Sequence, residues 1–127
     1  MIRMGWKWIL LPCLALVLLL AASGIASADR AEVDVDAPDT ARPGETVQVK
    51  LNVHHEDSAP GHYVDSVKLY DGDRLLKEWT YDNSNFERAE EWSVTYTGSF
   101  DRDVNLRAVV NCNLHGGEPD TEVIIVR

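Results

Sequence analysis

The sequence has few cysteines, few long apolar runs and little helical patterning, and each shortage excludes a class of protein. Of its two cysteines, Cys13 lies in an apolar N-terminal run, which leaves Cys112 as the only cysteine in the rest of the chain. A single cysteine cannot form an intrachain disulfide framework. After residue 28 no apolar run approaches the roughly 20 residues that span a bilayer, and no segment keeps a helical period over a useful length.

The first 28 residues have the pattern of a signal peptide. Arg3 and Lys7 precede an apolar run from Ile9 to Ala22, and Ala26-Ser27-Ala28 matches the small-residue motif that signal peptidases cut. We therefore expect a signal helix within residues 1–28, cleavage after that motif, and an extracytoplasmic location, either periplasmic or at the cell surface. An uncleaved leader would instead be a membrane anchor, the only contact with a membrane, and the folded part would still face outward.

Basic residues are in the minority. Without Arg3 and Lys7 the chain has 10 basic and 21 acidic side chains, a net charge of −11 with the histidines neutral. Such a surface repels nucleic acid and anionic lipid, so we expect neither as a partner. Residues 29–127 are enough for one domain with a single core. The sequence does not indicate an oligomeric state.

Short segments with alternating apolar residues, separated by turn-forming residues, predict an all-β domain. The expected strands are residues 31–36, 46–54, 63–70, 74–79, 91–97, 105–112 and 121–126. Short strands at this spacing are typical of a two-sheet sandwich of immunoglobulin type. We therefore predict an immunoglobulin-like sandwich of about seven strands over residues 29–127.

All four histidines of the chain lie near the ends of expected strands, in two short segments. The two-residue period puts His55 on the apolar face of strand 46–54 and His54 on the opposite face. Cys112 ends the apolar row of strand 105–112, and His115 follows three residues later. His62 opens the third strand after a loop that can fold it back beside His55. A thiolate with imidazoles suits iron, copper or zinc rather than calcium or magnesium, so the sequence predicts a metal site at the rim of the sandwich.

These residues resemble the iron-binding domain of the desulfoferrodoxin and superoxide reductase family. The similarity runs from about Thr46 to Gly116, and it is carried by His55, His62-Tyr63, Glu78-Trp79 and Cys112-Asn113-Leu114-His115-Gly116. The resemblance implies an immunoglobulin-like sandwich with one mononuclear iron (Fe2+/Fe3+), with His55, His62 and His115 as equatorial ligands and Cys112 as the axial thiolate. It also implies superoxide as the substrate, reduced to hydrogen peroxide with electrons from an external donor that the sequence does not identify.

The similarity is incomplete upstream of the site. The family has a fourth equatorial histidine, preceded by Glu and Lys, whereas residues 29–53 contain no histidine. His54 is the histidine that is left for this position. Because neighbouring strand residues point to opposite faces, His54 can reach the metal only if the strand ends or bulges there.

Two other functions fit parts of the pattern. A Cys-x-x-His motif on a sandwich, with an upstream histidine, also resembles the type 1 copper site of the cupredoxins, which makes copper the alternative cofactor. No methionine or glutamine follows His115 to serve as the weak axial ligand of such a site. The third alternative is a non-catalytic immunoglobulin-like interaction module in which Cys112 is buried and inert.

Overall fold

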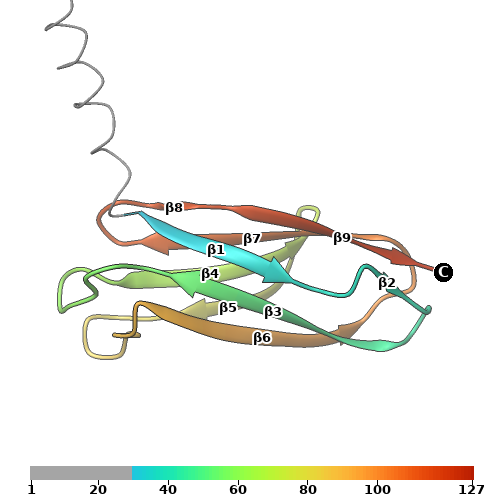
Figure 1. Ribbon diagram of the computed structural model, residues 1–127, viewed down its shortest axis with the longest axis horizontal. Helices are drawn as coiled ribbons and strands as arrows, with labels where there is room; N and C mark the ends of the chain where they lie inside the picture. The colour runs from blue at the N-terminus through green and yellow to red at the C-terminus, as the bar shows by residue number, and fades with distance from the viewer. Residues whose placement is uncertain (1–29) are drawn as a thin grey trace, which may run out of the picture.

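Two β-sheets face each other and enclose one apolar core in the computed structural model, which describes residues 30–127 (Figure 1). One sheet has four strands in the order β6-β3-β1-β8, and the other has five in the order β2-β9-β7-β4-β5. The expected all-β two-sheet sandwich is therefore confirmed. The signal helix expected within residues 1–28 lies outside the described residues. Between residues 30 and 127, no helix is long and apolar enough to cross a membrane.

The seven longer strands match the seven expected segments, with ends that differ by two residues or fewer. They are β1 (Ala31–Asp36), β3 (Thr46–His54), β4 (Val64–Asp71), β5 (Arg74–Thr80), β6 (Glu91–Ser99), β7 (Val104–Cys112) and β9 (Asp120–Val126). Two strands of two residues each were not expected, namely β2 (Thr40–Ala41) and β8 (Gly117–Glu118). They pair parallel with β9 and β1 respectively. Segments this short have no periodicity that the sequence could display.

The core is formed by the inward rows of strands whose burial alternates strictly. From Thr46 to Val53 on β3, and along all of β7, every second residue is buried. Burying a valine or leucine side chain stabilises the fold by roughly 1.5–3 kcal/mol relative to leaving it exposed. Because the alternation does not slip, the inward row of β3 continues directly to His55, and the inward row of β7 ends at Cys112.

The alternation is interrupted in β4, close to this end of the sandwich. Val64 pairs with Cys112 and Ser66 with Asn111, so Asp65 is an extra residue opposite β7. Its carbonyl oxygen accepts a hydrogen bond from the Tyr81 backbone at 2.9 Å, and its carboxylate accepts one from Asn111 Nδ2 at 2.9 Å. This bulge shifts the residues that precede Val64, including His62, by one position relative to the rest of β4. The sequence periodicity did not predict the bulge.

Candidate metal centre

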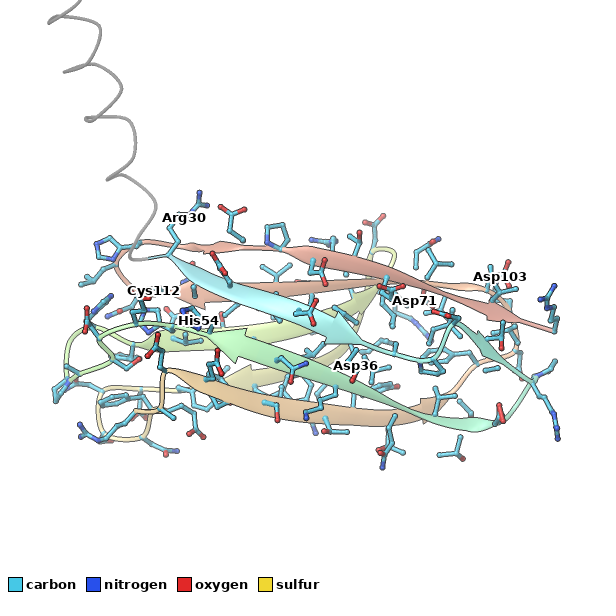
Figure 2. The ribbon with its side chains drawn as sticks, in the orientation of Figure 1. Arg30, Asp36, His54, Asp71, Asp103 and Cys112 are labelled. Carbon is cyan, nitrogen blue, oxygen red and sulfur yellow. The ribbon has the colours of Figure 1, made fainter. Side chains whose placement is uncertain are left out.

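The predicted ligands converge at the end of the sandwich where β3 and β7 end and β4 begins (Figure 1). Figure 2 shows Cys112 at this end, near Arg30, whereas Asp71 and Asp103 lie toward the other end. The ligand atoms of His55, His62 and Cys112 all lie within 4.8 Å of one another. The ring of His115 contacts that of His62 with a centroid separation of 5.2 Å. Four of the five predicted site residues are thus brought together.

Burial changes across this group, from the core to the solvent. Cys112 and His55 are 1% and 0% exposed, His62 is partly buried, and His115 is exposed. The group therefore has an inner side made by β3 and β7 and an outer side that solvent can reach past His115. A rim position of this kind was expected from the strand ends.

His55 is held immediately after the last paired residue of β3. Its backbone N–H donates to the carbonyl oxygen of Glu90 at 2.9 Å, which extends the pairing with the β6 side by one residue. Its ring atom Nδ1 lies 2.7 Å from the hydroxyl oxygen of Ser58. The first contact fixes the backbone of His55 and the second orients its imidazole, which occupies the last inward position of an apolar row.

His62 is positioned by a tight turn. Ala59 and His62 exchange two backbone hydrogen bonds of 2.8 and 2.9 Å around Pro60 and Gly61. Gly61 has a φ of +85°, which suits the third residue of a type II turn and which a side chain would disfavour. The N–H of Gly61 also donates to Asn83 Oδ1 at 2.6 Å, which joins this turn to the loop between β5 and β6.

The tautomer of His62 follows from its hydrogen bond. Nδ1 lies 3.1 Å from the backbone carbonyl oxygen of Asp57, and a carbonyl can only accept, so Nδ1 carries the proton. In the neutral imidazole the lone pair is then on Nε2, which is buried and has no hydrogen-bond partner among residues 30–127. Metal-ligating histidines commonly donate their other ring N–H to a backbone carbonyl. Asp57 itself adopts a left-handed conformation with a φ of 57°.

Cys112 begins a short turn that carries His115. Cys112 and Gly116 exchange two backbone hydrogen bonds of 3.0 Å, and Gly116 has a φ of +71°. Inside the turn, the side chain of Asn113 donates to the carbonyl of Gly61 at 3.1 Å and accepts from the N–H of Tyr63 at 3.0 Å. Asn113 therefore ties the cysteine turn to the turn that holds His62.

His54 lies on the outer face of β3, away from the other four residues. Its Nε2 is 3.6 Å from carboxylate oxygens of Glu56 and Glu90, and its Nδ1 is 3.6 Å from Glu91. The register of β3 is intact at this point, since His54 pairs with Glu32 on β1 and with Glu91 on β6. The strand neither ends nor bulges before His54, so its side chain stays opposite to that of His55.

The loop between β5 and β6 supports the centre and was not identified from the sequence. Its Phe86 ring stacks on Tyr63 with a centroid separation of 5.3 Å, and the Arg88 guanidinium lies 4.6 Å from the Phe86 ring. The segment Asp82-Asn83-Ser84-Asn85 is rich in turn formers, but the sequence gives no sign that this turn docks beside His62.

Two titratable groups of this loop have shifted pKa values. The pKa of Asp82 is lowered, chiefly because its carboxylate accepts hydrogen bonds from the side chain and backbone of Ser84 and also from the backbone of Asn85. The pKa of the Tyr81 phenol is raised, first by burial and then by the charge of Glu87. The carboxylate of Asp82 thus organises the turn that carries Asn83.

The whole group lies within a recognised family domain. The family model of desulfoferrodoxin matches residues 30–117, a range that includes every predicted ligand. The chain belongs to the desulfoferrodoxin family. This membership confirms the resemblance found in the sequence. The desulfoferrodoxin match also extends the similarity upstream of Thr46 to the start of β1.

Solved structures share the fold of this desulfoferrodoxin domain. The superoxide reductase (neelaredoxin) from Ignicoccus hospitalis is 22% identical, with a TM-score of 0.64, and the match covers 76% of this chain and 80% of that one. A putative superoxide reductase from Thermotoga maritima is 18% identical, with a TM-score of 0.62 over 76% and 86% of the two chains. A CARDB domain from Pyrococcus furiosus, solved in complex with di-metal ions, is 16% identical, with a TM-score of 0.63 over 80% and 90%. No curated protein sequence matches the chain.

The donors of this desulfoferrodoxin centre suit a transition metal. One thiolate and several imidazoles form a set that binds iron, copper or zinc well and calcium or magnesium poorly. The buried Nε2 of His62 points to the same chemistry, because a buried polar atom without a hydrogen-bond partner is costly and a metal would satisfy it.

Proposed function

We propose that this protein is an exported, mononuclear iron-binding protein that reduces superoxide to hydrogen peroxide with electrons from an external donor. The observation that carries the proposal is the convergence of His55, His62 and Cys112 within 4.8 Å, in a chain of the desulfoferrodoxin family. His115, whose ring contacts that of His62, is proposed as a further ligand. Bound iron would supply one-electron chemistry between its ferrous and ferric states.

The contacts of the side chains around the centre support this proposal. Cys112 is almost completely buried, which protects its sulfur from oxidants in solution. The backbone carbonyl of Asp57 keeps the proton of His62 on Nδ1 and so leaves Nε2 available as a donor. The reduction adds one electron and two protons to each superoxide. The protons would come from solvent, which reaches the centre past the exposed His115.

Export is proposed from the leader pattern. Residues 1–28 carry the charged, apolar and small-residue regions of a signal peptide, and residues 29–127 would be the mature domain. A lone thiol in an oxidising compartment tends to be oxidised unless something holds it. A metal on Cys112 would add to the protection that its burial gives, so a lone thiol is compatible with both parts of the proposal.

The immunoglobulin-like type of the sandwich is also proposed. In the lettering used for immunoglobulin domains, one sheet holds strands A (β1), B (β3) and E (β6). The other sheet holds strands C (β4), C′ (β5), F (β7) and G (β9). This distribution supports an immunoglobulin-like arrangement without a D strand.

The test is metal analysis of the mature chain, purified without oxygen, together with its visible spectrum and its rate of superoxide consumption. We expect about one iron per chain and a thiolate-to-iron absorption band after oxidation. Cys112→Ser should abolish that band, while Asn105→Ser, an exposed position of the same strand, should leave it unchanged. An intense blue copper band would support the cupredoxin alternative, and the absence of stoichiometric metal would support the interaction module; either result would overturn the iron proposal.

A further inference from the structure

The four histidines of the chain lie on two sides of the end of β3, three on the inner side and one on the outer side. The rings of His55 and His62 are 4.8 Å apart on the inner side, and His115 continues this group. The ring of His54 lies outside, surrounded by carboxylates. Moving His54 to the inner side would require breaking its pairing with both neighbouring strands. The fold therefore leaves three imidazoles, those of His55, His62 and His115, as candidate ligands, although the sequence contains four.

No carboxylate completes the set. The group that joins His55, His62 and Cys112 contains no aspartate or glutamate from residues 30–127. The carboxylates of Glu56 and Glu90 lie on the outer face instead, each with an oxygen 3.6 Å from His54 Nε2. Among the described residues this group therefore supplies two nitrogens and one sulfur, and His115, whose ring contacts that of His62, is the candidate for a third nitrogen.

We propose that the centre holds its metal through only these four protein ligands and leaves two coordination positions for a bidentate, monoanionic oxygen ligand. The proposal rests on the proposed iron function. Non-haem iron sites with fewer than six protein ligands keep their remaining positions open for exogenous molecules. Two open positions allow a chelating ligand to bind, whereas a single open position allows only a monodentate one.

Burial indicates the side on which these positions lie. Cys112 and His55 close the inner side with 1% and 0% exposure, so an added ligand has room only on the outer side, near the exposed His115.

Charge defines the class of ligand. A ferric ion with one thiolate and three neutral imidazoles has a local charge of about +2, which attracts an anion. In residues 29–127 the acidic residues outnumber the basic ones, 21 to 10, and this opposes the approach of highly charged anions. A hard ferric ion also prefers oxygen donors. Together these effects favour a small monoanion with two oxygen donors over a dianion.

The experiment combines X-ray absorption with ligand titration of the ferric mature chain. The absorption fine structure should give one sulfur and three imidazoles per iron. Acetohydroxamate, a bidentate monoanion, should bind with a stoichiometry of one per iron and with iron retained after gel filtration. Oxalate, a dianion that also chelates, should bind more weakly. His54→Ala should leave the imidazole count unchanged and the hydroxamate affinity within about twofold, because an exposed side chain on the opposite face interacts only weakly with the centre.

The outcomes separate this proposal from the iron function. Four imidazoles in the wild type, and three in His54→Ala, would overturn the four-ligand set while leaving the iron function intact. Iron that is retained but does not bind acetohydroxamate would overturn the second open position. A chain without iron, or without the thiolate band, would overturn the iron function itself. If His54→Ala does not fold, His54→Gln tests the same point, and the imidazole count of the wild type decides without any variant.

Discussion

Asn113 and Tyr63 are joined by two hydrogen bonds between segments that are 50 residues apart in the sequence. The backbone N–H of Asn113 donates to the carbonyl of Tyr63 at 3.0 Å, and the N–H of Tyr63 donates to Asn113 Oδ1 at 3.0 Å. Tyr63 follows His62, and Asn113 follows Cys112. The asparagine side chain and the backbone beside it therefore help to fix the separation of these two candidate ligands, together with the pairing of Val64 with Cys112.

Asn113→Ala should weaken metal binding and destabilise the metal-free domain. The substitution removes the two side-chain hydrogen bonds, one from the N–H of Tyr63 and one to the carbonyl of Gly61, each worth roughly 0.5–1.5 kcal/mol, and leaves the backbone hydrogen bond to Tyr63 in place. The metal-free protein should unfold at a temperature lower by about 4–8 °C for each kcal/mol lost. Thermal unfolding and competition with a chelator would measure the two effects. Asn105→Ala, an exposed asparagine near the other end of β7, is the control and should change neither. Equal effects of the two variants would contradict the role of Asn113.

Metal affinity should depend on the backbone conformation of Asp57 more than on its carboxylate. Its carbonyl accepts the hydrogen bond from His62 while its φ is 57°, a conformation that β-branched residues rarely adopt. Asp57→Gly should therefore preserve metal affinity, whereas Asp57→Val should lower it by about 10- to 100-fold, as is typical when the hydrogen-bond partner of a ligating histidine is lost. Chelator competition would compare the variants. Loss of affinity in Asp57→Gly would show that the carboxylate is needed instead.

Alternation in the sequence was sufficient to predict the longer strands and the faces of their residues. It placed His55 and Cys112 at the ends of apolar rows and His54 on the opposite face, because β3 and β7 keep their two-residue period without a break. It could not predict the bulge at Asp65, where pairing with β7 interrupts the period. The docking of Asn83 and Phe86 against the His62 turn was also out of reach, since it joins loops that have no period of their own.

Superoxide consumption should become faster as salt is added. Superoxide is an anion, and acidic side chains outnumber basic ones in this chain by nine. Long-range repulsion then slows the encounter, and salt screens it over a distance of about 10 Å at 0.1 M ionic strength. Stopped-flow measurements of the consumption rate between low and moderate salt would show the trend. The binding rate of a neutral ligand is the control and should not change with salt. A rate that falls with salt would indicate a local positive field near the centre.

Acid should loosen the loop that carries Asn83 and Phe86. The pKa of Asp82 is lowered below its ordinary value of 3.8, mainly by hydrogen bonds from Ser84. Its contribution to stability is therefore complete above pH 3.8 and is lost as the pH falls through the lower pKa of the folded state. Asp82→Asn removes this titration, so its stability should decline less steeply below pH 3.8 than that of the wild type. Unfolding temperatures of the metal-free proteins would be compared, with Asp101→Asn as the control for the loss of one carboxylate.

Alanine should destabilise the domain more at Gly117 than at Gly116, although both glycines follow His115. A side-chain carbon at Gly117 would overlap the carbonyl oxygen of Val110 in the core, whereas one at Gly116 would meet open space. Gly117→Ala should therefore cost about 1–3 kcal/mol, as overpacking of a core does, because β8 must move away from β7. Gly116 has a φ of +71°, so Gly116→Ala strains only the backbone and should cost about 1–2 kcal/mol.

Urea unfolding of the metal-free variants measures this difference in stability. The urea concentration at the midpoint should fall, while the slope of the unfolding free energy against urea stays unchanged. Gly72→Ala is the matched control, since Gly72 has a φ of +57° and open space in the hairpin between β4 and β5. Gly116→Ala and Gly72→Ala should lower the midpoint to a similar extent, and Gly117→Ala should lower it further. Only Gly116→Ala and Gly117→Ala should also weaken metal binding, because both alter the turn that carries His115. A Gly117→Ala midpoint equal to that of Gly72→Ala would show that β8 yields easily and that the close contact with Val110 does not hold this turn in place.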